Sequence, residues 1–259
     1  MSIFVIFVMI HKLLPNKYMC TVTLIPQPNN GFILTSNRDE SPNRVSTPPD
    51  FYNFKASRLL FPKDERSGGT WIGVSDKNRV VCVLNGAFIA HKHLDNYRMS
   101  RGVIAKHVLT LDDLLKELNN FRLDSIEPFT MVIVDFKKDL KFYELVWDGQ
   151  EKHFIELPLA PKLWSSSTLY DAEMKNQRQA WFCDFLNNRQ ASETDILSFH
   201  KTAGTKNLHF GVVMDRGFVK TTSISQIIKA ESKLTMRYND LQSQQLVLKQ
   251  IDYPIPYHG

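Results

Sequence analysis

The chain has 259 residues, 43% hydrophobic and 23% charged, so it can bury a sizeable core and is neither disordered nor collagen-like. Its formal charge of +5 comes from lysines and arginines scattered among nearly as many acids, which argues against nucleic acid as a partner. Three cysteines, at positions 20, 82 and 183, lack C-x-x-C spacing; this argues against a disulfide framework and a metal site and favours a reducing, cytoplasmic setting.

The first apolar run, "IFVIFVMI" at residues 3–10, is too short for a membrane-spanning helix, which needs about 20 residues. The following "LLPNKYM" carries Pro15 and Lys17 where a secretory cleavage site needs small residues. We therefore expect neither a membrane span nor export.

Strand and turn patterns dominate the next part of the chain. Residues 20–26 and 31–37 alternate polar and apolar side chains around "QPNNG", which predicts a hairpin. Residues 41–67 hold four prolines and are expected to form a long surface loop. A second hairpin is predicted over 70–86, turning at "DKN", and apolar residues at helical spacing predict helix over 99–119 with a restart capped by Thr110.

The second half of the chain is predicted to form strands, then helices, then strands again. Strands are predicted at 129–136, 140–147 and 152–157, helices at 171–188 and 193–202, and strands at 217–228 and 240–251. Runs of strands followed by runs of helices indicate an α+β layered fold. No internal repeat or long linker divides the chain, so we expect a single domain over 19–259.

Four short segments contain polar residues that a buried hairpin would not need: Cys20, "SNRDE" at 36–40, "SGGTW" at 67–71 and "LNG" at 84–86. The first hairpin would place Arg38 and Asp39 close to Cys20, because its strands are antiparallel. A guanidinium favours the thiolate form of a thiol, whose reference pKa is about 8.5.

An N-terminal Cys20 would add a base to this group. Its α-amino group, with a pKa of about 8, could accept the thiol proton, while Asp39 held the ammonium or oriented Arg38. This arrangement requires a free amine on Cys20. We therefore expect residues 1–18 to be a non-native or removable extension, with Met19 rather than Met1 as the true start.

Each of these residues also has an ordinary structural interpretation. A cysteine that heads an apolar strand is commonly a core residue, and Cys82 and Cys183 are both expected in the core. "NRDE" could be a turn in which Asn37 and Asp39 satisfy backbone groups. Gly69 could serve a tight turn or let backbone approach a ligand, and Trp71 fits either core or pocket wall. The histidines of "AHKH" (90–93) fit a solvated loop better than a metal site.

The segments "MCTVTLI", "TSNRDE", "GGTWIGVS" and "VLN", in this order, resemble the NRDE-domain family, also called the Transport and Golgi organisation protein 2 family. That family is similar to N-terminal-nucleophile hydrolases, which implies a four-layer αββα sandwich. The resemblance implies that Cys20 is the nucleophile, that Arg38 and Asp39 are its partners and that Asn85 donates to the oxyanion hole. Many relatives carry an asparagine after a serine where this chain has Ser166 or Ser167.

The remaining residues of the motifs are candidates for substrate contact. These are Asn37, Gly69, Thr70 and Trp71. The preferred hypothesis is a cytoplasmic amidohydrolase that acts on a non-peptide C–N bond of a small-molecule amide and needs no metal or organic cofactor. The alternative is a non-catalytic binding or trafficking protein on the same fold, which handles haem or another hydrophobic ligand such as lipid, or acts in secretory-pathway organisation, with Cys20 as an axial thiolate for haem.

Overall fold

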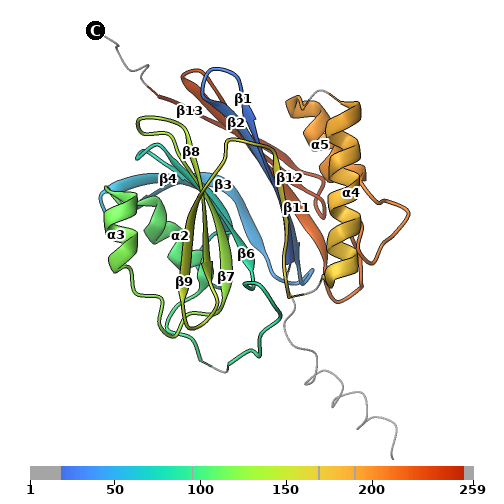
Figure 1. The fold of residues 1–259 in the computed structure, drawn as a ribbon, viewed down its shortest axis with the longest axis horizontal. Coiled ribbons are helices and arrows are strands. Elements are labelled where there is room, and N and C mark those ends of the chain that lie inside the picture. The colour runs from blue at the N-terminus through green and yellow to red at the C-terminus, as the bar shows by residue number, and fades with distance from the viewer. Residues whose placement is uncertain (1–18, 95, 169, 190, 254–259) are drawn as a thin grey trace, which may run out of the picture.

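Two antiparallel sheets pack face to face between two pairs of helices (Figure 1). The structure is a computed structural model that describes residues 19–253 except 95, 169 and 190. The predicted extension over residues 1–18 lies outside the described residues. The layers confirm the expected α+β fold and its αββα order.

The six-stranded sheet has the order β10-β1-β2-β11-β12-β13. Its strands are β1 (Met19–Gln27), β2 (Gly31–Glu40), β10 (Lys162–Ser165), β11 (Lys220–Ala230), β12 (Lys233–Asp240) and β13 (Leu246–Asp252). The predicted hairpin is confirmed: β1 pairs with β2, and Asn29 and Asn30 turn the chain at φ 56°. Asparagine tolerates this left-handed conformation better than most residues.

The seven-stranded sheet follows chain order from β3 to β9. Its strands are β3 (Ser46–Phe54), β4 (Ser57–Asp64), β5 (Ile72–Ser75), β6 (Arg79–Asn85), β7 (Phe129–Asp135), β8 (Lys141–Trp147) and β9 (Lys152–Leu157). The prediction of a surface loop over 41–67 is wrong, because β3 and β4 form a hairpin there. Pro48 and Pro49 fall at a register shift on the edge strand β3, where a missing N–H is tolerated.

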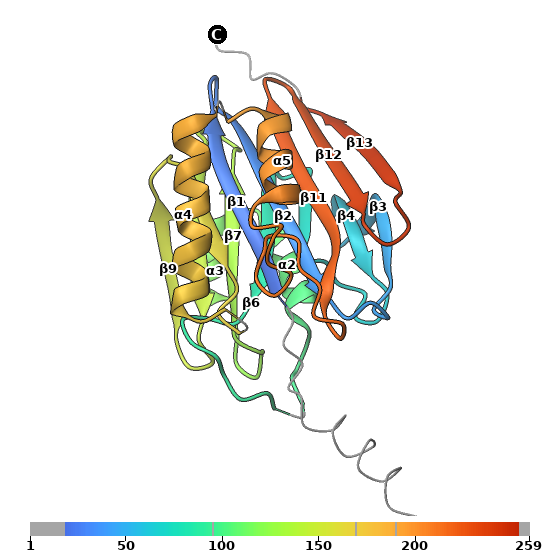
Figure 2. The same ribbon diagram turned by 90° about the vertical axis from the view of Figure 1, so that its right-hand side faces the viewer.

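Four helices cover the outer faces in the described part of the chain. They are α2 (Arg101–Leu109), α3 (Leu114–Asn120), α4 (Ala172–Asn188) and α5 (Glu193–Thr202). Figure 2 shows α4 and α5 lying across β1, β2 and β11. The helical prediction over 99–119 is confirmed, but Ser100 and Asp113 cap the two helix starts, and Thr110 instead ends α2.

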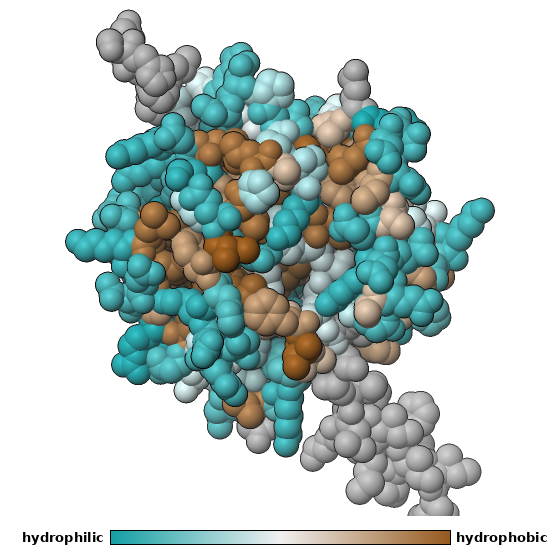
Figure 3. Space-filling model, viewed as in Figure 1, coloured by the Kyte–Doolittle hydropathy of each residue, from teal (hydrophilic) through white to brown (hydrophobic). Residues whose placement is uncertain are grey.

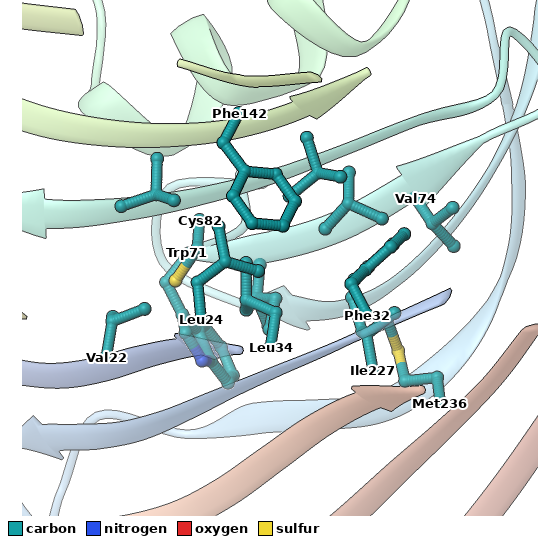
Figure 4. Packing of buried hydrophobic residues seen from close by; sticks show 14 of the residues in the cluster. Val22, Leu24, Phe32, Leu34, Trp71, Val74, Cys82, Phe142, Ile227 and Met236 are labelled. Carbon is teal, nitrogen blue, oxygen red and sulfur yellow. The ribbon is translucent and has the colours of Figure 1, made fainter. Parts of the chain in front are cut away.

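Apolar side chains fill three interfaces between the four layers. Between the sheets, Val22 and Leu34 meet Cys82 and Phe142 (Figure 4). A second cluster joins α2 and α3 to the seven-stranded sheet, and a third joins α4 and α5 to the six-stranded sheet. The close packing between the two sheets therefore fixes the position of β1, which carries Cys20 at its start.

The cysteines divide between core and surface. All three are free, Cys20 and Cys82 are buried, and Cys183 is exposed. The core position predicted for Cys183 is wrong. The inward face of α4 passes through Arg178 and Phe182, which lie four residues apart, and Cys183 is rotated by about 100° away from that face.

The outer surface carries hydrophobic side chains in separate patches among polar ones on the face shown in Figure 3. Among the helices of the described residues, none has the length and apolar character needed to cross a membrane.

Candidate active site

Cys20 lies at the start of β1, a strand that is paired on both sides. Cys20 is in register with Arg38 on β2, and its carbonyl accepts a hydrogen bond of 3.2 Å from the Ser166 N–H just after β10. Paired residues of an antiparallel ladder share one face, so the Cys20 and Arg38 side chains both point towards the seven-stranded sheet. The predicted proximity of Cys20 to Arg38 is confirmed.

A cavity of about 330 Å³ opens beside the Cys20 thiol. Six of the predicted site residues line it: Cys20, Arg38, Asp39, Thr70, Trp71 and Asn85. Further charged residues line it: Glu40, which ends the "NRDE" motif, and five that the motifs did not indicate, namely Arg44, Asp64, Arg66, Arg101 and Glu127. These five come from the β2–β3 loop, β4, the β4–β5 turn, the start of α2 and the segment before β7, so no single stretch of sequence reveals them.

Arg38 is held by carboxylates rather than left free for the thiol. Its Nη2 donates to Asp64 Oδ2 at 2.7 Å, and its guanidinium lies 4.6 Å from the centre of the Trp71 ring. Arg44 Nε donates to the same Asp64 oxygen at 2.8 Å. Glu40 pairs with Arg44 at 3.1 Å. The Arg38 charge is therefore largely balanced within the site.

The surroundings of Cys20 favour the neutral thiol over the thiolate. Burial raises its pKa well above the ordinary value, and Cys82 and Asp39 act in the same direction, while Arg38 opposes them. The predicted activation by Arg38 thus has the right direction but is outweighed by desolvation. Formation of the thiolate needs a base close to the sulfur.

Asp39 is almost fully buried on the helix side of the sheet, at the edge of the same cavity. The Thr221 hydroxyl donates to its Oδ1, and the Tyr170 hydroxyl donates to its Oδ2 at 3.5 Å. Burial raises the pKa of Asp39 to about 7, and the positive charge of Arg178 works against this rise. Asp39 can therefore exchange a proton near neutral pH.

Arg178 on α4 holds this region together from the helix layer. It is fully buried, donates from Nε to the Phe210 carbonyl at 2.9 Å and from Nη2 to the Gly211 carbonyl at 2.7 Å, and also donates to the hydroxyls of Thr21 and Tyr170. We call Asp39, Tyr170, Arg178 and Thr221 the Asp39 network. Sequence reasoning missed Arg178, although its position four residues before Phe182 on the inward face of α4 was a usable signal.

Asn37 faces away from the cavity, so its prediction as a substrate contact is wrong. It pairs with Thr21, one residue from Cys20, and alternation along the strand turns it towards α5. Its Nδ2 donates to the carbonyls of His200 at 2.9 Å and Val212 at 2.8 Å, and its Oδ1 lies 2.6 Å from His200 Nδ1. Asn37 therefore joins α5 to the sheet.

The GGTW residues mainly fix the cavity wall. A Cβ on Gly69 would lie 2.5 Å from the Gly102 carbonyl carbon, so Gly69 allows close contact with α2, and it does not itself line the cavity. The Thr70 hydroxyl faces the Pro62 and Ile72 carbonyls at 2.8 and 2.7 Å. Trp71 belongs to the core between the sheets and also lines the cavity, so both of its sequence interpretations hold.

Ser166 ties the two sheets together beside the thiol. Its N–H donates to the Cys20 carbonyl, and its hydroxyl donates to the Asn85 carbonyl at the end of β6. Asn85 lines the cavity, and its side-chain amide has no hydrogen bond to any described residue. Asn85 can therefore donate to a ligand, while Ser166 holds its strand next to Cys20.

The histidines of "AHKH" converge on Glu127. His91 Nε2 and His93 Nδ1 lie 3.3 and 3.2 Å from its Oε1, and Arg101 Nη2 lies 3.1 Å from its Oε2. Across the described residues, no group of three or more side chains suited to hold a metal ion is present. Glu127 thus serves as the counter-charge of Arg101.

Comparison with known proteins places these features in a family context. The sequence profile of the family "Transport and Golgi organisation 2" matches residues 19–202. The human "Transport and Golgi organization protein 2 homolog" is 30% identical over 108 residues, which are 40% of this chain and 38% of that protein.

Solved structures share the fold at low sequence identity. Penicillin V acylase from Agrobacterium tumefaciens matches with a TM-score of 0.56 at 10% identity, over 90% of this chain and 86% of that one. The N-acylethanolamine-hydrolyzing acid amidase ortholog of Caenorhabditis elegans matches with 0.55 at 11% identity, over 80% and 92%. A conjugated bile acid hydrolase from Clostridium perfringens gives 0.50 at 12% identity, over 90% and 92%. The sandwich is therefore that of N-terminal-nucleophile hydrolases.

Proposed function

The chain belongs to the Transport and Golgi organisation 2 family, and on this premise we propose that it is a cysteine N-terminal-nucleophile amidohydrolase for a non-peptide C–N amide bond. One observation carries the proposal. Cys20, Arg38 and Asn85 line one cavity, although they come from three strands in two sheets. The fold shared with an acylase, a hydrolase and an acid amidase supports a hydrolytic reaction.

The reaction proceeds through an acyl-enzyme. Cys20 Sγ attacks the amide carbonyl carbon, and the thiol proton passes to the α-amino group of Cys20. Asn85 Nδ2 donates to the developing oxyanion, a contact worth about 3 kcal/mol of barrier. The C–N bond then breaks, the amine leaves with the proton, and water hydrolyses the thioester to the carboxylic acid and the free thiol.

The α-amino group is the base that the buried thiol requires. We propose that the bond between Met19 and Cys20 is cut, or that synthesis begins at Met19 and this methionine is removed. Asp39 is in register with Met19 on the neighbouring strand and lines the cavity. A new ammonium at Cys20 would then lie beside the Asp39 carboxylate, which holds it by charge.

The test combines N-terminal mass analysis of protein from its native host with trapping by an electrophilic acyl probe such as a β-lactone. We expect a mature chain that begins at Cys20, and one acyl adduct that maps to Cys20 and disappears in Cys20→Ala. Cys183→Ala is the matched control, because it removes an exposed thiol that does not line the cavity. A native chain that retains residues before Cys20, or labelling that Cys20→Ala does not change, would overturn the proposal.

The proposal includes a reducing, cytoplasmic setting, which three free cysteines support. The alternative, a carrier of haem or lipid, receives less support from a cavity lined mostly by charged and polar side chains. A haem titration monitored by absorbance separates the two: a Cys20-dependent spectral shift without any acyl adduct would favour the carrier.

A further inference from the structure

The cavity beside Cys20 is unusual in its charge. Ligand pockets are mostly lined by apolar side chains with a few polar groups, whereas this one contains four arginines and four carboxylates. Besides Cys20, its large apolar side chains are those of Trp71 and Val83. Such a wall suits a hydrophilic ligand, and a volume of about 330 Å³ suits a small one.

Two of the four arginines are committed to the protein. Arg38 and Arg44 share the Asp64 carboxylate at 2.7 and 2.8 Å, and both also lie near Glu40, at 3.7 and 3.1 Å. This group of two cations and two anions is balanced. Its function is to hold β2 against β4 behind the thiol.

The other two arginines have capacity for a ligand. Arg101 Nη2 pairs with Glu127 at 3.1 Å and Nη1 donates to the Pro128 carbonyl at 3.2 Å, so two of its five N–H groups have partners among the described residues. Arg66 has neither an ion pair nor a hydrogen bond to any described residue. Both line the cavity.

The segments that carry these two arginines are locked together. The Thr70 N–H donates to the Gly102 carbonyl at 3.2 Å, and Lys106 Nζ donates to the Gly68 carbonyl at 2.8 Å. The β4–β5 turn, which carries Arg66, therefore abuts the first turn of α2, which carries Arg101. Two guanidinium groups thus approach the cavity from adjoining parts of its wall.

We propose that the substrate is a small hydrophilic amide that also bears a carboxylate, and that Arg66 and Arg101 hold that carboxylate while the amide carbonyl lies at Cys20. The inference rests on the proposed function, because it names the substrate class of the same site. Guanidinium and carboxylate match in geometry and charge, and their hydrogen bonds are among the strongest in proteins. Each of the four carboxylates in the wall lies near an arginine of the protein. The carboxylate of the ligand can therefore bind Arg66 and the unused N–H groups of Arg101.

The test measures binding separately from hydrolysis. Full-length Cys20→Ala protein is titrated calorimetrically with glutaric acid monoamide, which carries one carboxylate, and with glutaramide, its neutral diamide. We expect the monoamide to bind about ten to a hundred times more tightly, the range for a charged hydrogen bond. The preference should shrink as salt is raised.

Variants in this background give opposite expected shifts. Arg66 is exposed, so its truncation to alanine should be tolerated. Arg66→Ala should bring the ratio of the monoamide and diamide affinities towards one, and Arg101→Met should do the same. Glu127→Gln removes the counter-charge of Arg101 and should tighten monoamide binding several-fold. Arg122→Ala is the matched control, because this exposed arginine pairs with Asp124 outside the cavity.

A ratio near one, or no binding of either probe, would overturn the inference, as would a loss in Arg122→Ala equal to that in Arg66→Ala. These outcomes leave the proposed hydrolase untouched if the acyl probe still labels Cys20. The reverse result is a preference for the monoamide together with no acyl adduct in the protein that retains Cys20. It would overturn the proposed hydrolase and leave the anion site supported.

Discussion

Replacement of Arg178 by methionine tests the Asp39 network through the pH dependence of stability. Arg178 is fully buried, and its charge opposes the rise of the Asp39 pKa to about 7. Methionine fills similar volume but removes the charge and the bonds to the Phe210 and Gly211 carbonyls. Each unsatisfied buried group costs about 1–3 kcal/mol at every pH.

The charge contributes an additional cost that depends on pH. Asp39 binds its proton more tightly in the folded chain, with a pKa of about 7 against an ordinary 3.8, so folding loses stability as pH rises between these values. Without Arg178 the folded pKa of Asp39 rises further, so this loss continues above pH 7. The free-energy cost of Arg178→Met should therefore be constant below about pH 6 and grow above pH 7 by about 1.4 kcal/mol for each unit of added pKa.

Urea unfolding at pH 5.5 and pH 9, followed by tryptophan fluorescence and circular dichroism, measures this growth. Asp39→Asn is the matched background, because Arg178→Met made in it should cost the same at both pH values. Arg178→Lys retains the charge and should show less growth, and it serves if the methionine variant does not fold. An equal cost at both pH values in the otherwise unchanged chain would refute the assigned coupling between Arg178 and Asp39.

Three further predictions concern the frame around the site. Gly69→Ala should lower the free energy of unfolding by about 1–3 kcal/mol, because its Cβ would press on backbone at 2.5 Å. In Gly217→Ala the new Cβ meets nothing within 4 Å, so the variant should lose only about 1 kcal/mol, the cost of the left-handed conformation. Equal losses of stability for the two variants in urea titrations would contradict the close contact at Gly69. A thiol reagent should modify Cys183 rapidly in the native protein and Cys82 only after unfolding; mass mapping that finds both at one rate would refute the burial of Cys82. Burial lowers the pKa of His200 to about 3 from an ordinary 6.5, so the folded state binds fewer protons and stability falls as pH drops from about 6.5 towards 3. His200→Gln should flatten that fall between pH 7 and pH 4, and an unchanged slope would argue against His200 as its source.

Local patterns were sufficient for the centre of the site. The "QPNNG" turn sets the register of β1 and β2, and that register alone brings Arg38 opposite Cys20. The same register also predicts that Asn37 faces the opposite side of the sheet from Arg38, because neighbouring residues of a strand face opposite sides. The family motif drew attention to Asn37 for its identity, although its role is structural.

Contacts between distant segments explain what the sequence did not reveal. Arg101 reaches the cavity because α2 packs on the β4–β5 turn, Glu127 pairs with it from the segment before β7, and neither belongs to a recognisable motif. The prolines of β3 imitate a loop signal, yet an edge strand with a register shift accommodates them. Propensity is a weak guide at such positions, because tertiary pairing decides the outcome.

Strand β2 lies between β1 and β11, and this order has a consequence for biosynthesis. Residues 31–40 can pair with β1 as soon as the hairpin leaves the ribosome, but their other edge waits for residues 220–230. At about 5–20 residues per second, that delay is roughly 10 to 40 s. During this interval Cys20 first lacks Ser166, whose N–H binds its carbonyl, and the neighbouring Asp39 lacks Thr221 until the end. The candidate site is therefore completed only after residues 220–230 have been made, although Cys20 is made early, so a truncated nascent chain carries the thiol without its finished pocket.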